Sequence, residues 1–243
     1  MDNLLLLSGQ SIPLYELNLI INQPKLKDVA AVGEDRFFSG ISLFNMKKED
    51  FKESLPEDLY ESITNYDCFL MVVNHNKEYQ QQVTEVLSIF FPSYEVAILA
   101  DGMIFTIEGT NVEISKEQFE MLSKHMYKIC IPNSVSMKEQ EYKVESSAAA
   151  RIKEKLEKGK KKAEEINRRK KGQSGEGKTS ISPLVSSLAI ATGLSLNEVF
   201  EYTIIQFYDQ LFRHQHREQY QASLQAIMAG AKEVEIKSWY EEI

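Results

Sequence analysis

A strongly basic stretch, residues 151–171, constrains how this chain can fold. It contains eleven Lys and Arg against four Glu, a local charge of +7, so the rest of a chain with net charge −8 must sum to −15. Pairs such as Glu154 and Lys158 stand four residues apart, a spacing that stabilises a helix in water. The apolar stripe of this stretch is thin: Ala149, Ile152, Leu156, Ala163 and Ile166. We therefore predict a connector over residues 136–182, made of a basic helix and a Gly/Ser-rich linker.

The connector separates two predicted domains, residues 1–135 and residues 183–243. In the first, the segment up to about Gln23 is predicted to be extended, because residues 12–21 are rich in apolar side chains and are interrupted by Pro13. Pro24 suits the first turn of a helix, and we expect that helix to continue with a bend near Gly33. Its apolar stripe is Leu26, Val29, Gly33, Phe37, Ile41 and Phe44.

Two further helical patterns follow in the N-terminal domain. One is predicted over residues 48–63, and the apolar run 68–73 after it fits either a strand or a helix. The next helix is terminated by Pro92, because proline cannot continue the hydrogen-bond pattern. Its stripe is Tyr79, Val83, Val86, Leu87 and Phe90. This part of the domain is therefore expected to be mainly helical.

The periodicity changes after Glu95. Residues 96–99 and 103–107 are apolar runs around Asp101-Gly102, and residues 112–114 form a third short run. Asp-Gly between apolar runs is typical of a β-hairpin. The sequence thus predicts an α+β fold that is predominantly helical, with a small antiparallel sheet in the N-terminal domain.

Two capping boxes mark the starts of later helices. Ser115 and Gln118 are spaced to open a helix whose stripe ends at Cys130, and Ser195 and Glu198 have the same spacing. We expect the second box to open a helix that reaches Leu211. The C-terminal domain is completed by a helix from Pro183 to about Gly193 and by another that carries Tyr220, Leu224 and Ile227 and runs to Gly230.

The sequence gives little support for a metal site, a disulfide bond or a membrane span. Cys68 and Cys130 are far apart in apolar stretches, which predicts buried thiols in a reducing compartment. His214 and His216 are two residues apart, so they do not share a helix face, and no further ligand has metal-site spacing. The apolar run 4–7 is too short for a membrane span or a signal peptide. We expect no metal, no cofactor and no membrane association.

Residues 172–179, Gly-Gln-Ser-Gly-Glu-Gly-Lys-Thr, match the phosphate-binding P-loop pattern. That chemistry requires the loop to leave a buried strand and enter a helix, so that backbone amides surround the phosphates. Here the preceding residues are Arg168, Arg169, Lys170 and Lys171, and Pro183 soon follows. We interpret the segment as a flexible linker, with a nucleotide-hydrolysing enzyme as a distant alternative.

The basic stretch could also bind nucleic acid through phosphate contacts. It carries no aromatic residue for base stacking, and its four Glu interrupt the positive charge. A solvated connector is therefore the favoured interpretation, with a nucleic-acid-binding regulator and a docking strip for an acidic protein as alternatives. The residues that would contact a polyanion or an acidic partner are Lys160, Lys161, Lys162, Arg168, Arg169, Lys170 and Lys171.

Aromatic side chains concentrate in the C-terminal domain. Apolar stripes on helices usually face a core, which is the simpler explanation for Phe200 and Phe207. A few short helices after a linker bury little surface by themselves, however, so part of this surface is expected to pack on a partner or on another copy. The candidate partner-binding residues are Phe207, Tyr208, Phe212, Tyr220, Trp239 and Tyr240.

Three stretches outside the connector carry a family resemblance. They are Gln23-Pro24-Lys25-Leu26-Lys27-Asp28-Val29 with Gly33-Glu34, the run 87–92 ending in Phe90-Phe91-Pro92, and Ile204-Ile205-Gln206-Phe207-Tyr208-Asp209 leading to Ala229-Gly230-Ala231-Lys232 and Trp239. Together they resemble the tail assembly chaperones of bacteriophages that infect Gram-positive hosts.

The resemblance implies an assembly factor in the host cell cytoplasm that binds tape-measure or tail-tube proteins during virion morphogenesis. It implies no catalytic residues, in agreement with the lack of a catalytic pattern in the sequence. Such a protein covers apolar surface on a long, aggregation-prone partner until other subunits replace it. A related possibility is a structural hub or wedge component of the baseplate, which could remain in the virion tail.

Overall fold

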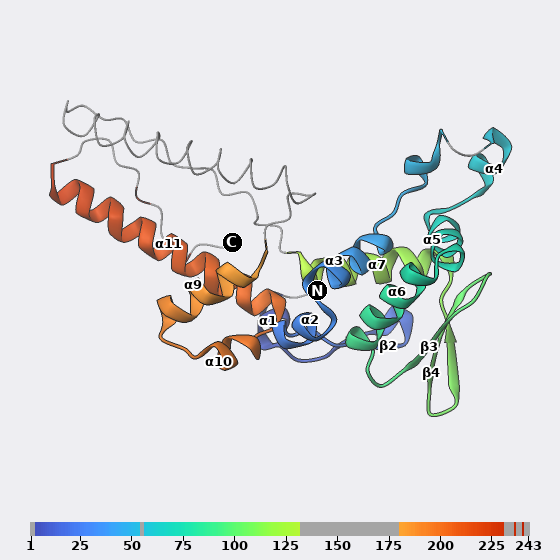
Figure 1. The fold of residues 1–243 in the computed structure, drawn as a ribbon, viewed down its shortest axis with the longest axis horizontal. Helices are drawn as coiled ribbons and strands as arrows, with labels where there is room; N and C mark the ends of the chain where they lie inside the picture. The colour runs from blue at the N-terminus through green and yellow to red at the C-terminus, as the bar shows by residue number, and fades with distance from the viewer. Residues whose placement is uncertain (1–2, 54–55, 132–179, 231–235, 237–239, 241–243) are drawn as a thin grey trace. The chain divides into compact units, whose positions relative to one another are not determined.

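The computed structural model describes residues 3–53, 56–131, 180–230, 236 and 240. The chain forms two compact units, the first comprising Met1–Val135 and Val185–Gln210, the second Ser136–Leu184 and Leu211–Ile243. The described part is mostly helical with two small antiparallel sheets, which confirms the predicted fold class (Figure 1). The predicted basic helix and nearly all of the Gly/Ser linker lie outside the described residues.

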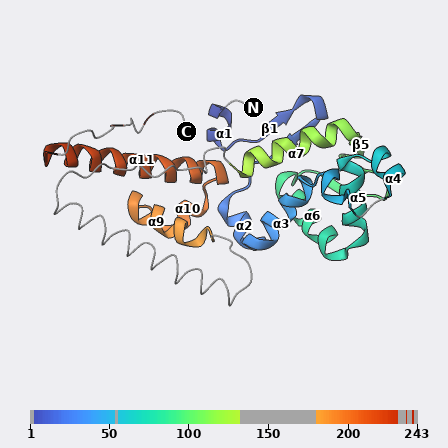
Figure 2. The same cartoon turned by 90° about the horizontal axis from the view of Figure 1, so that it is seen from above.

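The N-terminal segment forms a short helix and a hairpin. Helix α1 spans Asn3–Ser8, and strands β1 (Ile12–Leu14) and β2 (Leu19–Ile21) pair antiparallel across the 3-10 turn η1 (Tyr15–Leu17). Alternate side chains are buried along both strands, as a strand with one covered face requires. The extended conformation predicted up to about Gln23 is found in the two strands but not over residues 3–8, which form α1. The hairpin lies beside helix α7 (Figure 2), where the Gln118 side-chain amide donates to the Glu16 carbonyl at 3.2 Å.

The single bent helix expected after Pro24 is two helices. Helix α2 spans Leu26–Val32 and helix α3 spans Glu34–Phe44. Gly33 between them has φ 97° and ψ 133°, far from helical values. A side chain disfavours this backbone conformation, so glycine at this position separates the two helices rather than merely bending one.

The next helical region is also divided. The 3-10 turn η2 (Lys48–Phe51) and helix α4 (Glu57–Ser62) replace the single stretch expected over residues 48–63, because Pro56 caps α4 in an extended conformation. The ambiguous run 68–73 lies in helix α5 (Asn65–His75). Helix α6 (Lys77–Phe90) ends two residues before Pro92, as predicted.

The second sheet consists of β3 (Glu95–Ile98), β4 (Met103–Ile107) and β5 (Thr110–Glu113) in that order, all antiparallel. This confirms the predicted hairpin and its third run. Helix α7 (Lys116–Cys130) follows, and the Ser115 hydroxyl accepts a hydrogen bond from the Gln118 backbone N–H while the Gln118 side chain accepts one from the Ser115 N–H. The predicted capping box is therefore present.

An aromatic cluster joins helices α3, α5 and α7 in the core. The Phe119 ring centroid lies 4.6 Å from that of Tyr66, 4.8 Å from Phe69 and 6.0 Å from Phe44. All four side chains are buried. Aromatic pairs at these distances add attraction beyond the area that they bury.

The two cysteines are buried and unpaired. Burial raises the pKa of both thiols, because a thiolate is poorly solvated inside the protein. Buried thiols of this kind behave as small apolar side chains. The sequence-based interpretation of both cysteines as buried thiols is thereby confirmed.

The first C-terminal helix matches its prediction, whereas the two helices expected between Ser195 and Gly230 are divided at a different place. Helix α9 spans Ser182–Thr192, and helix α10 (Leu196–Phe200) begins at the predicted Ser195 capping box. The chain then leaves the helix at Glu201–Thr203, and α11 runs from Ile204 to Met228 without interruption. The expected single helix to Leu211 and the separate helix after it are therefore a short helix and one long helix.

A backbone interaction within the first unit explains the break after α10. The Leu26 N–H donates to the Tyr202 carbonyl at 3.0 Å, and the Ile204 N–H donates to the Pro24 carbonyl at 3.0 Å. This bridge pairs Lys25 with Thr203 in an antiparallel arrangement. A segment far away in the sequence thus pairs with Thr203 and interrupts the helical backbone between α10 and α11.

Side chains reinforce this connection. Glu201 accepts hydrogen bonds from Lys25 at 2.9 Å and Lys27 at 2.7 Å, and the Gln206 side-chain amide donates to the Leu7 carbonyl at 3.0 Å. Residues 185–210 therefore pack as part of the first unit. This differs from the predicted layout, in which residue 183 opens a separate C-terminal domain, because sequence periodicity carries no information on such long-range pairing.

Candidate functional site: a lysine-rich pocket on helix α7

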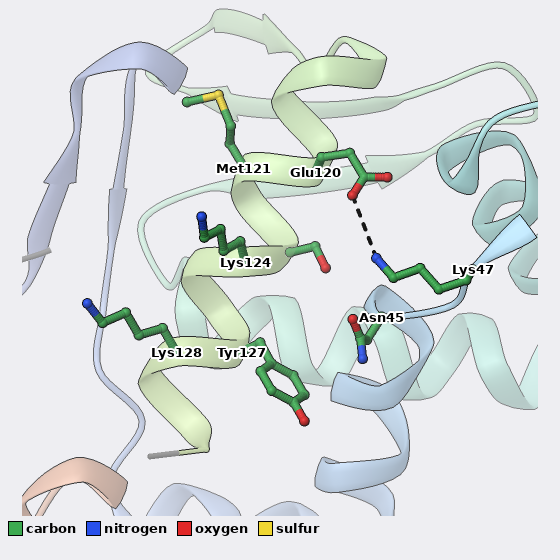
Figure 3. Close-up of a pocket in the computed structure, with 8 residues that line it drawn as sticks. Asn45, Lys47, Glu120, Met121, Lys124, Tyr127 and Lys128 are labelled. Carbon is green, nitrogen blue, oxygen red and sulfur yellow. Dashed lines mark ion pairs between the residues drawn. The ribbon is translucent and has the colours of Figure 1, made fainter. Parts of the chain in front are cut away.

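A pocket of about 560 Å³ lies on the exposed side of helix α7, within the first unit (Figure 3). Helix α7 contributes most of the lining, and the segment after α3 contributes the rest. The lining residues are Asn45, Lys47, Glu120, Met121, Ser123, Lys124, Tyr127 and Lys128.

The helical repeat explains which side chains of α7 reach the pocket. Glu120, Lys124, Tyr127 and Lys128 are spaced at i, i+4, i+7 and i+8, which places them on one face. The buried stripe of α7 faces the core on the other side; it comprises Phe119, Leu122, Met126, Ile129 and Cys130. Packing of the apolar stripe therefore fixes the direction of the polar face.

A buried hydrogen bond connects the two sides of the pocket. Ser123 points inward from α7, and its hydroxyl donates to the Phe44 carbonyl at the end of α3. Buried hydrogen bonds of this kind are costly to lose, because the carbonyl would remain unpaired. The bond holds Asn45 and Lys47, which follow α3 directly, beside the α7 face.

The pocket carries an excess of positive charge. Its three lysines and one glutamate sum to +2. Glu120 accepts a hydrogen bond from the Asn65 side chain at 2.6 Å, and the Lys47 ammonium lies 3.9 Å from its carboxylate. Among the described residues, no carboxylate lies within ion-pair distance of Lys124. The negative charge of the pocket is thus already engaged by polar neighbours.

The pocket combines cationic groups with apolar surface. Three of its four charged groups are ammonium ions, which donate hydrogen bonds to anions, and the Tyr127 ring and the Met121 side chain provide apolar surface. His125 is on the same helix but outside the pocket, and burial lowers its pKa. In the described part of the chain, no group of three or more His, Cys, Asp or Glu side chains is arranged to hold a metal ion.

The aromatic residues predicted to bind a partner occupy different environments. Phe207 and Phe212 are buried, so in this structure they do not form an exposed surface. The Tyr208 ring lies 5.2 Å from that of Phe207 and is partly buried, as is Tyr220. The Tyr240 side chain is 74% exposed, and Trp239 lies outside the described residues.

Other apolar residues of the C-terminal segment are exposed, and sequence reasoning did not single them out. Ile190 on α9 is 85% exposed and Leu196 on α10 is 50% exposed. Met228 at the end of α11 is 87% exposed. One signal was available for Ile190, because α9 is apolar over most of its circumference and a short helix seldom buries every face.

The remaining sequence-predicted sites cannot be placed. The seven Lys and Arg residues of the basic stretch and the P-loop-like residues 172–179 lie outside the described part of the chain. No helix in the described part is both long enough and apolar enough to span a bilayer.

The comparisons with known proteins concern the C-terminal part. Residues 169–243 match the family model described as YomV second domain. The match includes α9, α10, α11 and all six aromatic candidates, whereas the pocket on α7 lies before it. No curated protein and no solved structure matches the chain.

Proposed function

We propose that this protein is a non-enzymatic phage tail assembly chaperone that binds a tape-measure or tail-tube protein in the host cytoplasm. The observation that carries the proposal is the exposure of large apolar side chains in the C-terminal segment, Ile190, Leu196 and Met228. The resemblance of three sequence stretches to tail assembly chaperones points to the same role.

Exposed apolar side chains have a direct physical use in a chaperone. Covering an apolar surface removes it from water and contributes about 25 cal/mol for each Å² that is buried. Ile190 and Leu196 belong to the first unit and lie on successive helices of the chain, and each offers an exposed apolar side chain to a partner. A partner that exposes its own apolar face before assembly would gain from this contact and would aggregate less.

Co-expression with candidate tail proteins tests the proposal. The tagged full-length chain would be produced with tape-measure and tail-tube proteins, treated with nuclease, and recovered in moderate salt. We expect a tail protein to be recovered and Ile190→Asp to reduce that recovery at least fivefold. Tyr15→Asp is the matched control, because Tyr15 is 83% exposed on the N-terminal hairpin and the change in polarity is similar.

Two outcomes would contradict the proposal. Recovery of nucleic acid alone, lost as salt rises, would instead support binding through the basic stretch. Equal recovery of the tail protein by the Ile190 and Tyr15 variants would show that the α9 surface does not take part.

A further inference from the structure

We propose that the lysine-rich pocket on α7 is a docking site for an acidic, amphipathic peptide segment of a protein partner. The site lies in the first unit and shares no residue with the apolar surface invoked for the chaperone role. It therefore goes beyond that role and can be tested separately from it.

Charge complementarity identifies the polar part of the ligand. Lys124 and Lys128 are one helical turn apart, and their side chains extend in the same direction from α7 (Figure 3). Two carboxylates spaced by one helical turn on a ligand would match this pair. Glu120 is already engaged by Asn65 and Lys47, and among the described residues no carboxylate lies within ion-pair distance of Lys124.

The apolar part of the ligand follows from the other lining residues. Met121 is partly exposed on the side of α7 from which the two lysines extend, whereas Tyr127, which is 39% exposed, extends from the other side toward Asn45 (Figure 3). Aromatic rings and methionine bind apolar side chains of varied shape. A segment in which an apolar residue is flanked by glutamates would satisfy the apolar and cationic groups together.

A peptide fits the pocket better than a nucleic acid does. A polyanionic backbone that spans the pocket would bring its phosphates close to the Glu120 carboxylate, which repels them. A peptide can present carboxylates to Lys124 and Lys128 and leave Glu120 opposite a neutral residue. The apolar surface at Met121 also has a partner in a peptide side chain.

The pocket is largely pre-formed, which favours affinity. The Ser123 hydroxyl fixes α7 against the end of α3, and Lys116 on α7 forms a 2.8 Å ion pair with Asp67 on α5. The backbone that carries the lysines is therefore rigid before a ligand arrives. Binding then requires ordering of the lysine side chains but no rearrangement of helices.

Fluorescence anisotropy with a designed probe tests the proposal on the full-length chain. The probe is a labelled helical peptide with glutamates four residues apart beside leucine, and its reference carries glutamine at the same positions. We expect the double variant Lys124→Glu/Lys128→Glu to weaken binding of the acidic probe by on the order of tenfold or more. The double variant Lys52→Glu/Lys77→Glu makes the same change in net charge at exposed positions outside the pocket, and we expect it to weaken binding less than about threefold.

Three results would overturn the proposal. Equal losses in the two double variants would mean that net charge alone attracts the probe. Equal affinity for the glutamine reference would remove the role of the carboxylates. Stronger binding of an RNA oligonucleotide that also depends on Lys124 and Lys128 would assign the pocket to nucleic acid.

A second measurement avoids substitutions altogether. Lysine acetylation of the wild-type chain, followed by mass spectrometry, reports which ammonium groups the probe covers. We expect the acidic peptide to slow the modification of Lys124 and Lys128 at least threefold while Lys77 reacts at an unchanged rate. Unprotected Lys124 and Lys128 at saturating peptide would contradict the proposal.

Discussion

The helices around Phe119 and the α9–α10 segment bury apolar side chains to very different extents, although both are rich in them. Phe119 is enclosed by three aromatic rings from α3 and α5. On α9, Val185 and Leu188 are buried while Ile190 is 85% exposed. Apolar content alone therefore does not determine burial; the number of neighbouring elements does.

This difference separates two uses of apolar residues within the first unit. Where several helices converge, the side chains stabilise the fold. Where a short helix is covered on one side, the other side stays available for a partner. Four substitutions test this comparison, in order of decreasing expected effect on stability.

The largest loss is expected from Phe119→Ala. Removing the ring leaves a cavity among Tyr66, Phe69 and Phe44, and truncation of a buried phenylalanine costs about 3–5 kcal/mol. Urea unfolding followed by circular dichroism measures the change. A loss below about 1 kcal/mol would mean that the aromatic cluster is far looser than its centroid distances imply.

Gly40→Ala tests how closely two helices of the core approach. An added Cβ would lie 2.7 Å from a methyl carbon of Val86 and 3.2 Å from the Gln82 carbonyl oxygen on α6. Overpacking of this kind costs about 1–3 kcal/mol, although alanine is normally the better helix former. Ser42→Ala, at an exposed position of α3, is the control and should change the unfolding free energy by less than about 0.5 kcal/mol. A stabilised Gly40 variant would contradict the close packing.

Glu201→Gln examines how the segment after α10 is attached. Hydrogen bonds from Lys25 and Lys27 lower the pKa of Glu201 to about 2. Since this folded-state pKa lies below that of the unfolded chain, the stabilisation is complete above the unfolded value and is lost as pH falls toward 2. We expect the wild type to melt above the variant at neutral pH, with the difference in Tm shrinking through this acidic range. A difference that did not depend on pH would exclude the ionised carboxylate as its cause.

Ile190→Ala should have the smallest effect on stability. Because the side chain is mostly in water, its truncation should change the unfolding free energy by less than about 0.5 kcal/mol. Unfolding of this variant and of Phe119→Ala under the same conditions compares the two regions directly. If the Ile190 variant lost as much stability as the Phe119 variant, the contrast between them would be refuted.

The local parts of the fold were predictable because their signals are local. The Ser115 and Ser195 capping boxes each involve four consecutive residues, and both are present. A bend was predicted near Gly33, but whether the helix bends or breaks there depends on backbone angles that the sequence does not specify. The break at residues 201–203 arises from pairing with Lys25, and no periodicity near residue 201 reveals it.

Only the part of the pocket that α7 contributes could be predicted from the sequence. Glu120, Lys124 and Lys128 recur every four residues on the face opposite a clear apolar stripe, so their common direction could have been inferred. Their proximity to Asn45 and Lys47 could not, since it depends on the packing of α3 against α7. The aromatic residues of α11 show the converse limit, because helical spacing identified a stripe but not which of its members would be covered.

The bridge between Lys25 and Thr203 has a consequence for synthesis of the chain. The contacts that complete the first unit join residues 176 positions apart at Lys25–Glu201 and 199 apart at Leu7–Gln206. At ribosomal rates of about 5–20 residues per second, the early partner waits roughly 10–35 s for the late one. Lengthening the interval adds little entropic cost, because loop closure grows only logarithmically with length. The first unit is therefore among the last parts of the protein to finish folding, even though most of it is made first.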